Sequence, residues 1–86
     1  MTEAPETRIK RLKMRSWRRG IQEMDLILGK FSDTELASLN AASLDIYEQL
    51  LEENDWDLYY WVTGAQDTPE PYAALIERLA VFHKLG

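Results

Sequence analysis

The sequence has no cysteine and only one histidine, His83. Without cysteine there can be no disulfides, thiolate metal sites, iron–sulfur clusters or cysteine nucleophiles. A single histidine also leaves little for metal binding or acid–base catalysis. The chain contains no glycine-rich phosphate loop, no HExxH motif and no Ser/His/Asp set. These absences predict that the protein is not an enzyme, and we expect no catalytic residue and no metal site.

Long apolar runs are also missing. No stretch approaches the roughly 20 apolar residues that a membrane-spanning helix needs, so we expect no transmembrane segment. The N-terminus lacks the apolar region of a secretory signal. Residues 7–19 are rich in arginine and free of acidic residues, as in a transit peptide, but they run directly into the patterned region. We therefore interpret them as part of the mature fold.

The remaining composition is typical of one globular domain. The chain has 86 residues, of which 45% are hydrophobic and 29% charged, with three prolines and four glycines. We expect a single domain over residues 1–86, with residues 1–6 as a frayed end. A core that is stabilised without disulfides favours an intracellular protein.

The charges are distributed unevenly. Seven of the ten basic residues lie between Arg8 and Arg19, and residues 1–20 have a net charge of +5. Residues 21–86 carry thirteen acidic and three basic residues, a net of −10, so the whole chain has a charge of −5. This distribution predicts a basic face on an acidic body. Because the acidic part would repel a polyanion, we expect no nucleic acid as a partner.

The hydrophobic pattern is helical throughout and predicts an all-α fold, a compact bundle of four to five short helices. The first helix is expected over residues 5–18. A second begins near Gly20 and has an apolar face from Met24 to Phe31. Two continuations are open: the helix bends near Gly29 and runs on through Leu39, or a new helix starts at Ser32, because Ser32-x-x-Glu35 fits a capping box.

Three further helices are expected in the second half of the chain. Asn40 is predicted to cap a helix over residues 41–53, and Asp55 is predicted to cap a short helix that follows. Residues 64–71 have the composition of a loop. Pro71 fits the first turn of a final helix over residues 71–84.

Several polar and aromatic residues have an ordinary structural interpretation. The acidic run over residues 52–57 lacks the ligand spacing of a calcium loop and is expected to be a solvated loop that ends in a helix cap. His83 is expected at the surface in a last helical turn, where a cation complements the helix dipole. Trp56 and Tyr60 would share one side of their helix, either as an exposed partner-binding surface or packed on a neighbouring helix.

The segment Arg19-Gly20-Ile21-Gln22-Glu23 offers two interpretations. In the structural one, Gly20 forms the turn between two helices and Arg19 pairs with Glu23. In the functional one, Gly20 is a spot without a side chain, flanked by a guanidinium and a carboxylate, where another backbone docks closely. The residues alone leave both interpretations open.

The sequence resembles a known family at two places. Arg19-Gly20-Ile21-Gln22-Glu23, followed by Met24-Asp25-Leu26, is similar to the RGxxE motif of the SdhE-type flavin-assembly factors of succinate dehydrogenase. The run from Asp55 to Trp61 is similar to the second landmark of that family, although Trp56 stands where many relatives have proline. The likeness covers roughly residues 8–82.

The resemblance implies an assembly chaperone of respiratory complex II that binds the flavoprotein subunit of succinate dehydrogenase and promotes covalent FAD attachment to a histidine of that client. The fumarate reductase flavoprotein is a second candidate client. FAD would belong to the client, so no cofactor of this chain's own is expected, and a monomer is expected. Carried over by position, the partner-binding residues are Arg19, Gly20, Glu23 and Asp25, and the basic face would add Arg8, Arg11 and Arg15.

Two other functions stay open from the sequence. One is a toxin-neutralising or regulatory protein-binding module, a role once proposed for bacterial members of the family. The other is an adaptor whose basic helix binds an anionic membrane or nucleic acid. Because no separate presequence is visible, a bacterial cytoplasmic location is expected in preference to the mitochondrial matrix.

Overall fold

The helices of the protein enclose one buried cluster of apolar side chains. The computed structural model describes residues 3–84, and these contain helices and turns but no strand, which confirms the all-α prediction. The elements are α1 (Pro5–Ser16), α2 (Gln22–Glu35), the 3-10 turn η1 (Leu36–Ser38), α3 (Ala41–Leu50), α4 (Asp55–Thr63), the 3-10 turn η2 (Glu70–Tyr72) and α5 (Ala73–His83).

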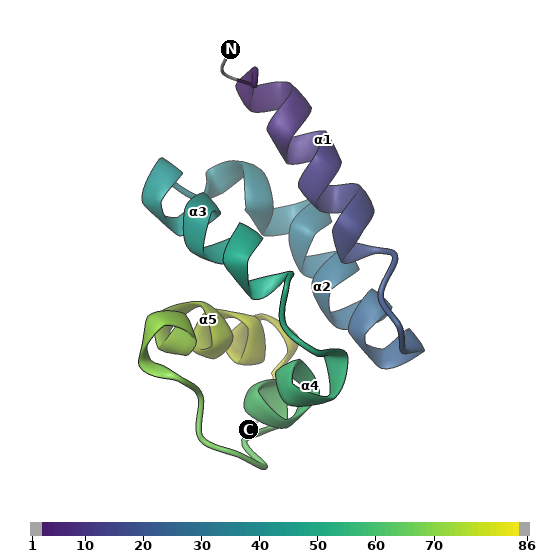
Figure 1. Ribbon diagram of the computed structural model, residues 1–86, viewed down its shortest axis with the longest axis vertical. Helices are drawn as coiled ribbons and strands as arrows, with labels where there is room; N and C mark the ends of the chain where they lie inside the picture. The colour runs from purple at the N-terminus through teal and green to yellow at the C-terminus, as the bar shows by residue number, and fades with distance from the viewer. Residues whose placement is uncertain (1–2, 85–86) are drawn as a thin grey trace.

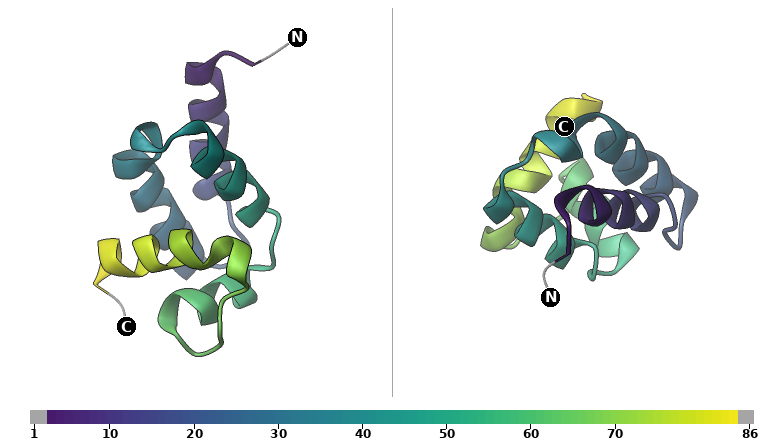
Figure 2. Two further views of the ribbon diagram at one scale, coloured as in Figure 1. Left: turned by 90° about the vertical axis from the view of Figure 1, so that its left-hand side faces the viewer. Right: turned by 90° about the horizontal axis from the view of Figure 1, so that it is seen from above.

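Helix α2 is the central element of the bundle. It packs against α1 and also contacts α4 and α5. In Figure 1, α1 and α2 lie side by side, α3 flanks them, and α4 and α5 form the end of the molecule away from the N-terminus. Figure 2 shows the same separation from the side, with α1 projecting beyond the other helices. The segment that connects α1 to α2 and the segment that connects α3 to α4 lie close to each other, near the start of α4.

Aromatic rings from three helices meet in the core. The fully buried Tyr47 of α3 stacks on Phe31 of α2 with 6.1 Å between the ring centroids, and Phe31 meets Phe82 of α5 edge-to-face at 5.6 Å. The Tyr47 hydroxyl lies 2.6 Å from Ser16 Oγ, which itself donates to the carbonyl of Leu12 at 2.8 Å. Because the Ser16 proton is directed at Leu12, the Tyr47 hydroxyl is the donor to Ser16. This chain of hydrogen bonds satisfies the polar groups in the core.

The α2 helix runs without interruption through the position where a restart was one of two expectations. Ser32 is fully buried inside α2 and donates from Oγ to the carbonyl of Gly29 at 2.8 Å, so it is not an N-cap and the capping-box expectation is wrong. The helix continues instead to Glu35 and tightens into η1. The apolar face from Met24 to Phe31 is buried, so packing holds one continuous helix.

Gly29 has a packing role. A Cβ added to Gly29 would overlap the indole ring of Trp17, which lies directly against the α2 backbone. The indole Nε1 donates to the Asp33 carboxylate at 3.2 Å and holds the ring in place. A side chain at position 29 would therefore displace the Trp17 ring from α2.

Asparagine side chains cap the N-termini of two helices, α3 and α4. Asn40 caps α3 as predicted, because its side chain accepts from the Ser43 N–H at 2.8 Å. The predicted cap Asp55 is wrong: Asn54 caps α4 by accepting from the Trp56 N–H at 2.8 Å, and Asp55 is the first helical residue. Helix α4 ends at Gly64, whose φ of 82° suits glycine.

Several predicted boundaries shift by a few residues. The first helix ends at Ser16 rather than at residue 18, and α3 ends at Leu50 rather than at residue 53. Pro71 lies in η2, which precedes α5, so the final α-helix starts two residues later than expected. Residues 1–2 of the predicted frayed end lie outside the described residues, and α1 begins at Pro5.

Candidate functional site

The Arg19 side chain joins two connections that are far apart in the sequence. From the α1–α2 connection, its Nε atom pairs with Asp55 Oδ1 at 2.7 Å. Its Nη1 and Nη2 atoms donate to the backbone carbonyls of Leu51 and Glu53 at 2.8 and 3.1 Å. The Arg19 side chain is only 9% exposed and that of Asp55 15%. We call this set of contacts the Arg19–Asp55 clamp.

The backbone around Gly20 is held by two carboxylates. The Gly20 N–H donates to Asp55 Oδ2 at 2.5 Å, and the Arg19 N–H donates to Asp25 Oδ1 at 2.5 Å. A Cβ added to Gly20 would lie 2.7 Å from Asp55 Oδ2, closer than a normal contact. On the side that faces Asp55, position 20 therefore has room for a hydrogen atom but not for a methyl group.

Gly20 and Glu23 are nevertheless presented to solvent. Both are exposed, and within residues 3–84 Glu23 takes part in no ion pair or side-chain hydrogen bond. The alternative pairing of Arg19 with Glu23 is wrong, because Arg19 pairs with Asp55. The motif thus consists of an inward guanidinium that holds the connection and an outward glycine and carboxylate. Contact of these residues with a partner stays a prediction.

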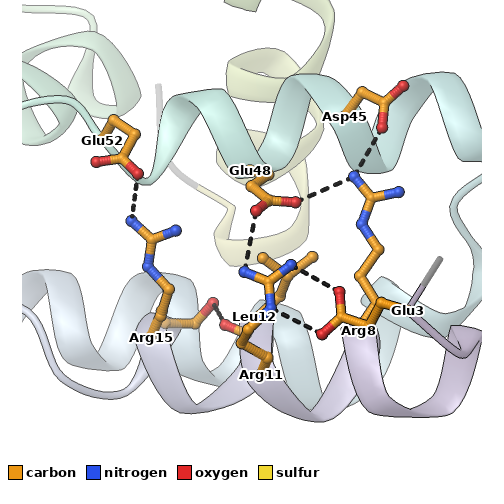
Figure 3. Close-up of polar contacts among 9 residues, drawn as sticks. Glu3, Arg8, Arg11, Leu12, Arg15, Asp45, Glu48 and Glu52 are labelled. Atoms are coloured by element: carbon orange, nitrogen blue, oxygen red, sulfur yellow. Dashed lines mark hydrogen bonds and ion pairs between the residues drawn. The ribbon is translucent and has the colours of Figure 1, made fainter. Parts of the chain in front are cut away.

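The basic stripe of α1 faces the acidic residues of α3 (Figure 3). Arg8 pairs with Asp45 at 2.7 Å and with Glu48 at 3.1 Å, and Arg11 pairs with Glu48 at 2.9 Å. One turn further along, Arg15 pairs with Glu52 at 3.1 Å. Arg11 also pairs with Glu3 at 2.9 Å. We call these contacts the α1–α3 ion-pair ladder.

The ladder perturbs the acidity of its members. Hydrogen bonds from Arg11 and then Arg8 hold the pKa of the Glu48 carboxyl below its usual range. The same kind of bond from Arg11 lowers the pKa of Glu3. The Asp45 carboxylate raises the pKa of Arg8. Each shift favours the charged form, so the ladder is a set of mutually neutralising charges rather than an open basic face.

Three other basic residues of this segment remain without an ion pair in the part of the chain that the structure describes: Lys10, Lys13 and Arg18. The predicted contact of Arg8, Arg11 and Arg15 with a partner is not tested by this arrangement. The α1–α3 ion-pair ladder nevertheless lowers the positive charge that this segment presents to solvent.

The aromatic residues of α4 divide between two sides of the helix. Trp56 and Tyr60 are 52% and 36% exposed, and their ring centroids lie 6.3 Å apart. The half-buried Tyr59 lies edge-to-face with Trp56 at 6.2 Å. Trp61 lies on the other side of α4, where its ring stacks on that of Tyr72 with 5.8 Å between the centroids. Of the two expectations, the exposed aromatic surface is the one that the structure has.

His83 does not have the surface role that was expected. It is half-buried, and its Nε2 atom lies 2.7 Å from the carbonyl oxygen of Ile27, so the end of α5 is tied to the middle of α2. The helical period places His83 correctly in the last turn of α5. The period cannot show that a carbonyl from a helix 56 residues away lies within reach.

Asp55 was predicted to be a helix cap, but it is a residue of the site. Its carboxylate receives both the guanidinium of Arg19 and the N–H of Gly20, and its own helix is capped by its neighbour Asn54. Two potential cap residues in succession were the available signal, because one helix needs only one cap.

Taken together, fold and site define a small all-helical protein whose candidate site is a rigidly held surface of backbone and carboxylate. None of the helices within residues 3–84 has the length and apolar character to cross a membrane. The family described as flavinator of succinate dehydrogenase matches residues 10–83. The chain belongs to this family, which confirms the resemblance to it as a family.

Relatives of known name agree with this assignment. The chain is 50% identical over 70 residues to the mitochondrial succinate dehydrogenase assembly factor 2 of Meyerozyma guilliermondii, covering 80% of this chain and 52% of the relative. It is 41% identical over 83 residues to the mitochondrial assembly factor 2-B of Drosophila mojavensis, covering 94% and 53%. The chain thus spans about half the length of these curated relatives.

The names of the relatives also correct one expectation. These proteins, and the assembly factor 2 of Aspergillus terreus at 52% identity over 60 residues (70% of this chain and 20% of the relative), are named as mitochondrial. The expectation of a bacterial cytoplasmic location over the mitochondrial matrix is therefore wrong. It rested on the absence of a visible presequence. That absence says nothing about the compartment of a chain that spans only about half the length of these relatives.

Proposed function

We propose that this protein is an assembly factor that binds the flavoprotein subunit of succinate dehydrogenase and promotes the covalent attachment of FAD to it. Membership of the flavinator family supports this function. The observation that carries it is the exposed pair Gly20 and Glu23, with the Gly20 backbone held by Asp55, which also pairs with Arg19. The fumarate reductase flavoprotein is a second candidate client.

The proposed mechanism is a population shift in the client. A factor that binds the attachment-competent arrangement of the flavoprotein better than the open one raises the fraction of competent molecules. This needs a preorganised surface, because a flexible one would lose binding energy to its own ordering. Arg19 and Asp25 would supply the rigidity, while Gly20 would allow close approach of the client backbone and Glu23 would form a charge-assisted hydrogen bond.

In this mechanism the chain acts as a chaperone and not as a catalyst. FAD would be bound and attached by the client, and this protein would need no cofactor of its own. It would act as a monomer that forms a one-to-one complex. The α1–α3 ion-pair ladder argues against the alternative of a basic adaptor for anionic membranes or nucleic acid, because it neutralises three arginines of that face.

Covalent flavinylation of the purified apo-flavoprotein subunit tests this function. Apo-flavoprotein and FAD are incubated with and without the chain, and covalent flavin is followed by in-gel fluorescence. We expect wild type to speed flavinylation and Glu23→Ala to lower that gain about tenfold, the loss expected for one charge-assisted contact. Glu77→Ala, at another exposed glutamate, should act like wild type.

Circular dichroism of both variants shows whether the fold is retained. Equal covalent flavin with and without the chain would contradict the proposed function. A stable complex with a different small protein and no change in flavin content would favour the toxin-neutralising or regulatory alternative. Gly20→Arg is a poorer probe than Glu23→Ala, because a side chain at position 20 also collides with Asp55.

A further inference from the structure

A groove lies directly beside the candidate site, between α2 and α4. It has a volume of about 330 Å³ and is lined by Glu23, Leu26, Ile27, Tyr59, Thr63 and His83. Glu23 belongs both to the exposed part of the motif, together with Gly20, and to the lining of this groove. The two features are therefore continuous, and a partner that reaches Glu23 also reaches the groove.

The groove opens onto an exposed apolar surface. Leu26 lies one turn after Glu23 on α2 and is 42% exposed. Tyr59 lines the groove on the α4 side and meets the ring of Trp56, which is 52% exposed. Tyr60 adds a third ring beside Trp56. Contiguous exposed apolar side chains of this kind mark interaction surfaces, and tryptophan and tyrosine supply much of the binding energy at such surfaces.

The charge at the rim of the groove is negative and uncompensated. Within residues 3–84, Glu23 has no ion-pair partner, whereas the neighbouring carboxylate of Asp55 is neutralised by Arg19. The imidazole of His83, which also lines the groove, has its Nε2 atom 2.7 Å from the Ile27 carbonyl oxygen. A carboxylate next to an apolar hollow is complementary to a cationic side chain next to an apolar one.

We propose that this groove binds a segment of the flavoprotein subunit that carries an apolar side chain beside an arginine or lysine. The apolar side chain enters the groove against Leu26 and Tyr59, and the cation pairs with Glu23. Trp56 and Tyr60 cover the flank of the segment. This inference rests on the proposed function and adds to it the chemistry of the client segment and the place where it lies.

The test compares two lysine substitutions that change the net charge equally. Leu26→Lys places a cation in the groove within reach of Glu23, at i and i+3 on the same helix. Val81→Lys is the matched control, at a position on α5 that is 70% exposed and outside the groove. Calorimetric titration with purified apo-flavoprotein should show affinity reduced at least about tenfold for Leu26→Lys and within about twofold of wild type for Val81→Lys.

A photo-reactive residue tests the occupant without a change of charge and decides the question if Leu26→Lys does not fold. With benzoylphenylalanine at position 26, mass spectrometry of the cross-linked complex should identify a flavoprotein peptide in which an arginine or lysine flanks an apolar residue. Cross-links to a second copy of this chain, or to a flavoprotein segment without a basic residue, would overturn the proposal.

The outcomes separate this inference from the function on which it rests. If wild type binds the flavoprotein and both lysine variants bind equally well, the groove proposal is wrong and the proposed function stands. If wild type does not bind the flavoprotein at all, both fail. Weakened binding by Leu26→Lys alone, together with the expected cross-link, supports the groove as the contact.

Discussion

At Gly20 the absence of a side chain serves the inside of the molecule. The Asp55 carboxylate occupies the space where a Cβ would lie and accepts hydrogen bonds from the Gly20 N–H and from Arg19. No positive φ is involved at Gly20, so the backbone itself would accept alanine. The requirement for glycine is therefore a steric one imposed by Asp55.

This account predicts that Gly20→Ala destabilises the fold through Asp55. The methyl group displaces the carboxylate from Arg19 and Gly20, and we expect the free energy of unfolding to fall by about 1–2 kcal/mol, the cost of disturbed hydrogen bonds to a charged group. Urea denaturation of Gly20→Ala, Asp55→Ala and the double variant measures the coupling. In the Asp55→Ala background, Gly20→Ala should cost less than about 0.5 kcal/mol. Additive effects of the two substitutions would contradict the account.

At the scale of the elements, α1 and α3 are joined mainly through long side chains. Arg8, Arg11 and Arg15 recur along one stripe of α1. They face Asp45 and Glu48 of α3 and Glu52 in the turn that follows α3 (Figure 3). Glu48 is the central member because it pairs with two arginines. Partly exposed pairs of this kind contribute little individually, and a network contributes more.

Glu48→Gln should therefore lower stability by roughly 0.2–1 kcal/mol at low salt, and the difference from wild type should vanish near 1 M salt. The pH dependence has a definite sign. Because the pKa of Glu48 is lowered in the folded state, its stabilisation is present above the ordinary glutamate pKa of about 4.3 and is lost as the pH falls below it. Thermal unfolding at pH 7 and pH 3 checks this.

The control for this experiment is Glu77→Gln, at an exposed position of α5 that takes part in no ion pair within the described residues. It should match wild type at both pH values and at both salt concentrations. A destabilisation by Glu48→Gln that is insensitive to salt would show that the ladder acts through packing of the arginine side chains rather than through charge.

At the scale of the whole molecule, one buried tyrosine connects most of the helices. Tyr47 of α3 donates to Ser16 at the end of α1 and stacks on Phe31 of α2, which in turn meets Phe82 of α5. Burial raises the pKa of the Tyr47 hydroxyl to about 12. The folded state thus keeps this proton where the unfolded chain, with a tyrosine pKa of about 10, releases it.

The alkaline stability of the protein should reflect this difference. Between pH 10 and pH 12 the unfolded chain binds fewer protons than the folded one, so the free energy of unfolding should fall as the pH rises. Tyr47→Phe should cost about 1 kcal/mol at pH 7, because the hydrogen bond to Ser16 is lost, and should flatten the alkaline decline. Denaturation curves at pH 7, 10 and 11 measure both effects. An unchanged alkaline slope in Tyr47→Phe would assign the decline to other groups.

Much of the fold can be predicted from local patterns. The five helices follow from apolar residues at helical spacing, and Asn40 and Gly64 mark ends that their side chains, or the lack of one, produce locally. The resemblance at residues 19–26 and 55–61 indicates a family, and the match over residues 10–83 shows that the chain belongs to it. The exposed position of Gly20 and Glu23 agrees with the functional interpretation of the motif, whose contact with a partner stays a prediction.

The errors at Ser32 and Asp55 have a common cause in contacts between distant residues. Ser32 fits a capping box, but burial of the α2 face keeps the helix continuous through it. Asp55 fits an N-cap, but Arg19 and Gly20, which lie 36 and 35 residues away, take its carboxylate. Gly29 gave no signal beyond its weak helix propensity, because the need for glycine there comes from the ring of Trp17, the residue that follows α1.

The amino-acid sequence by itself determined the helices, some of their ends and the family, because these depend on periodicity, capping and motif spacing along a few consecutive residues. Only the tertiary structure decided the partners of the charged groups. It paired the arginine stripe of α1 with α3, turned Arg19 inward to Asp55 and left Glu23 free beside an apolar groove within the described residues. The physical reason is that an ion pair depends on distances in space, which are set only when the helices pack.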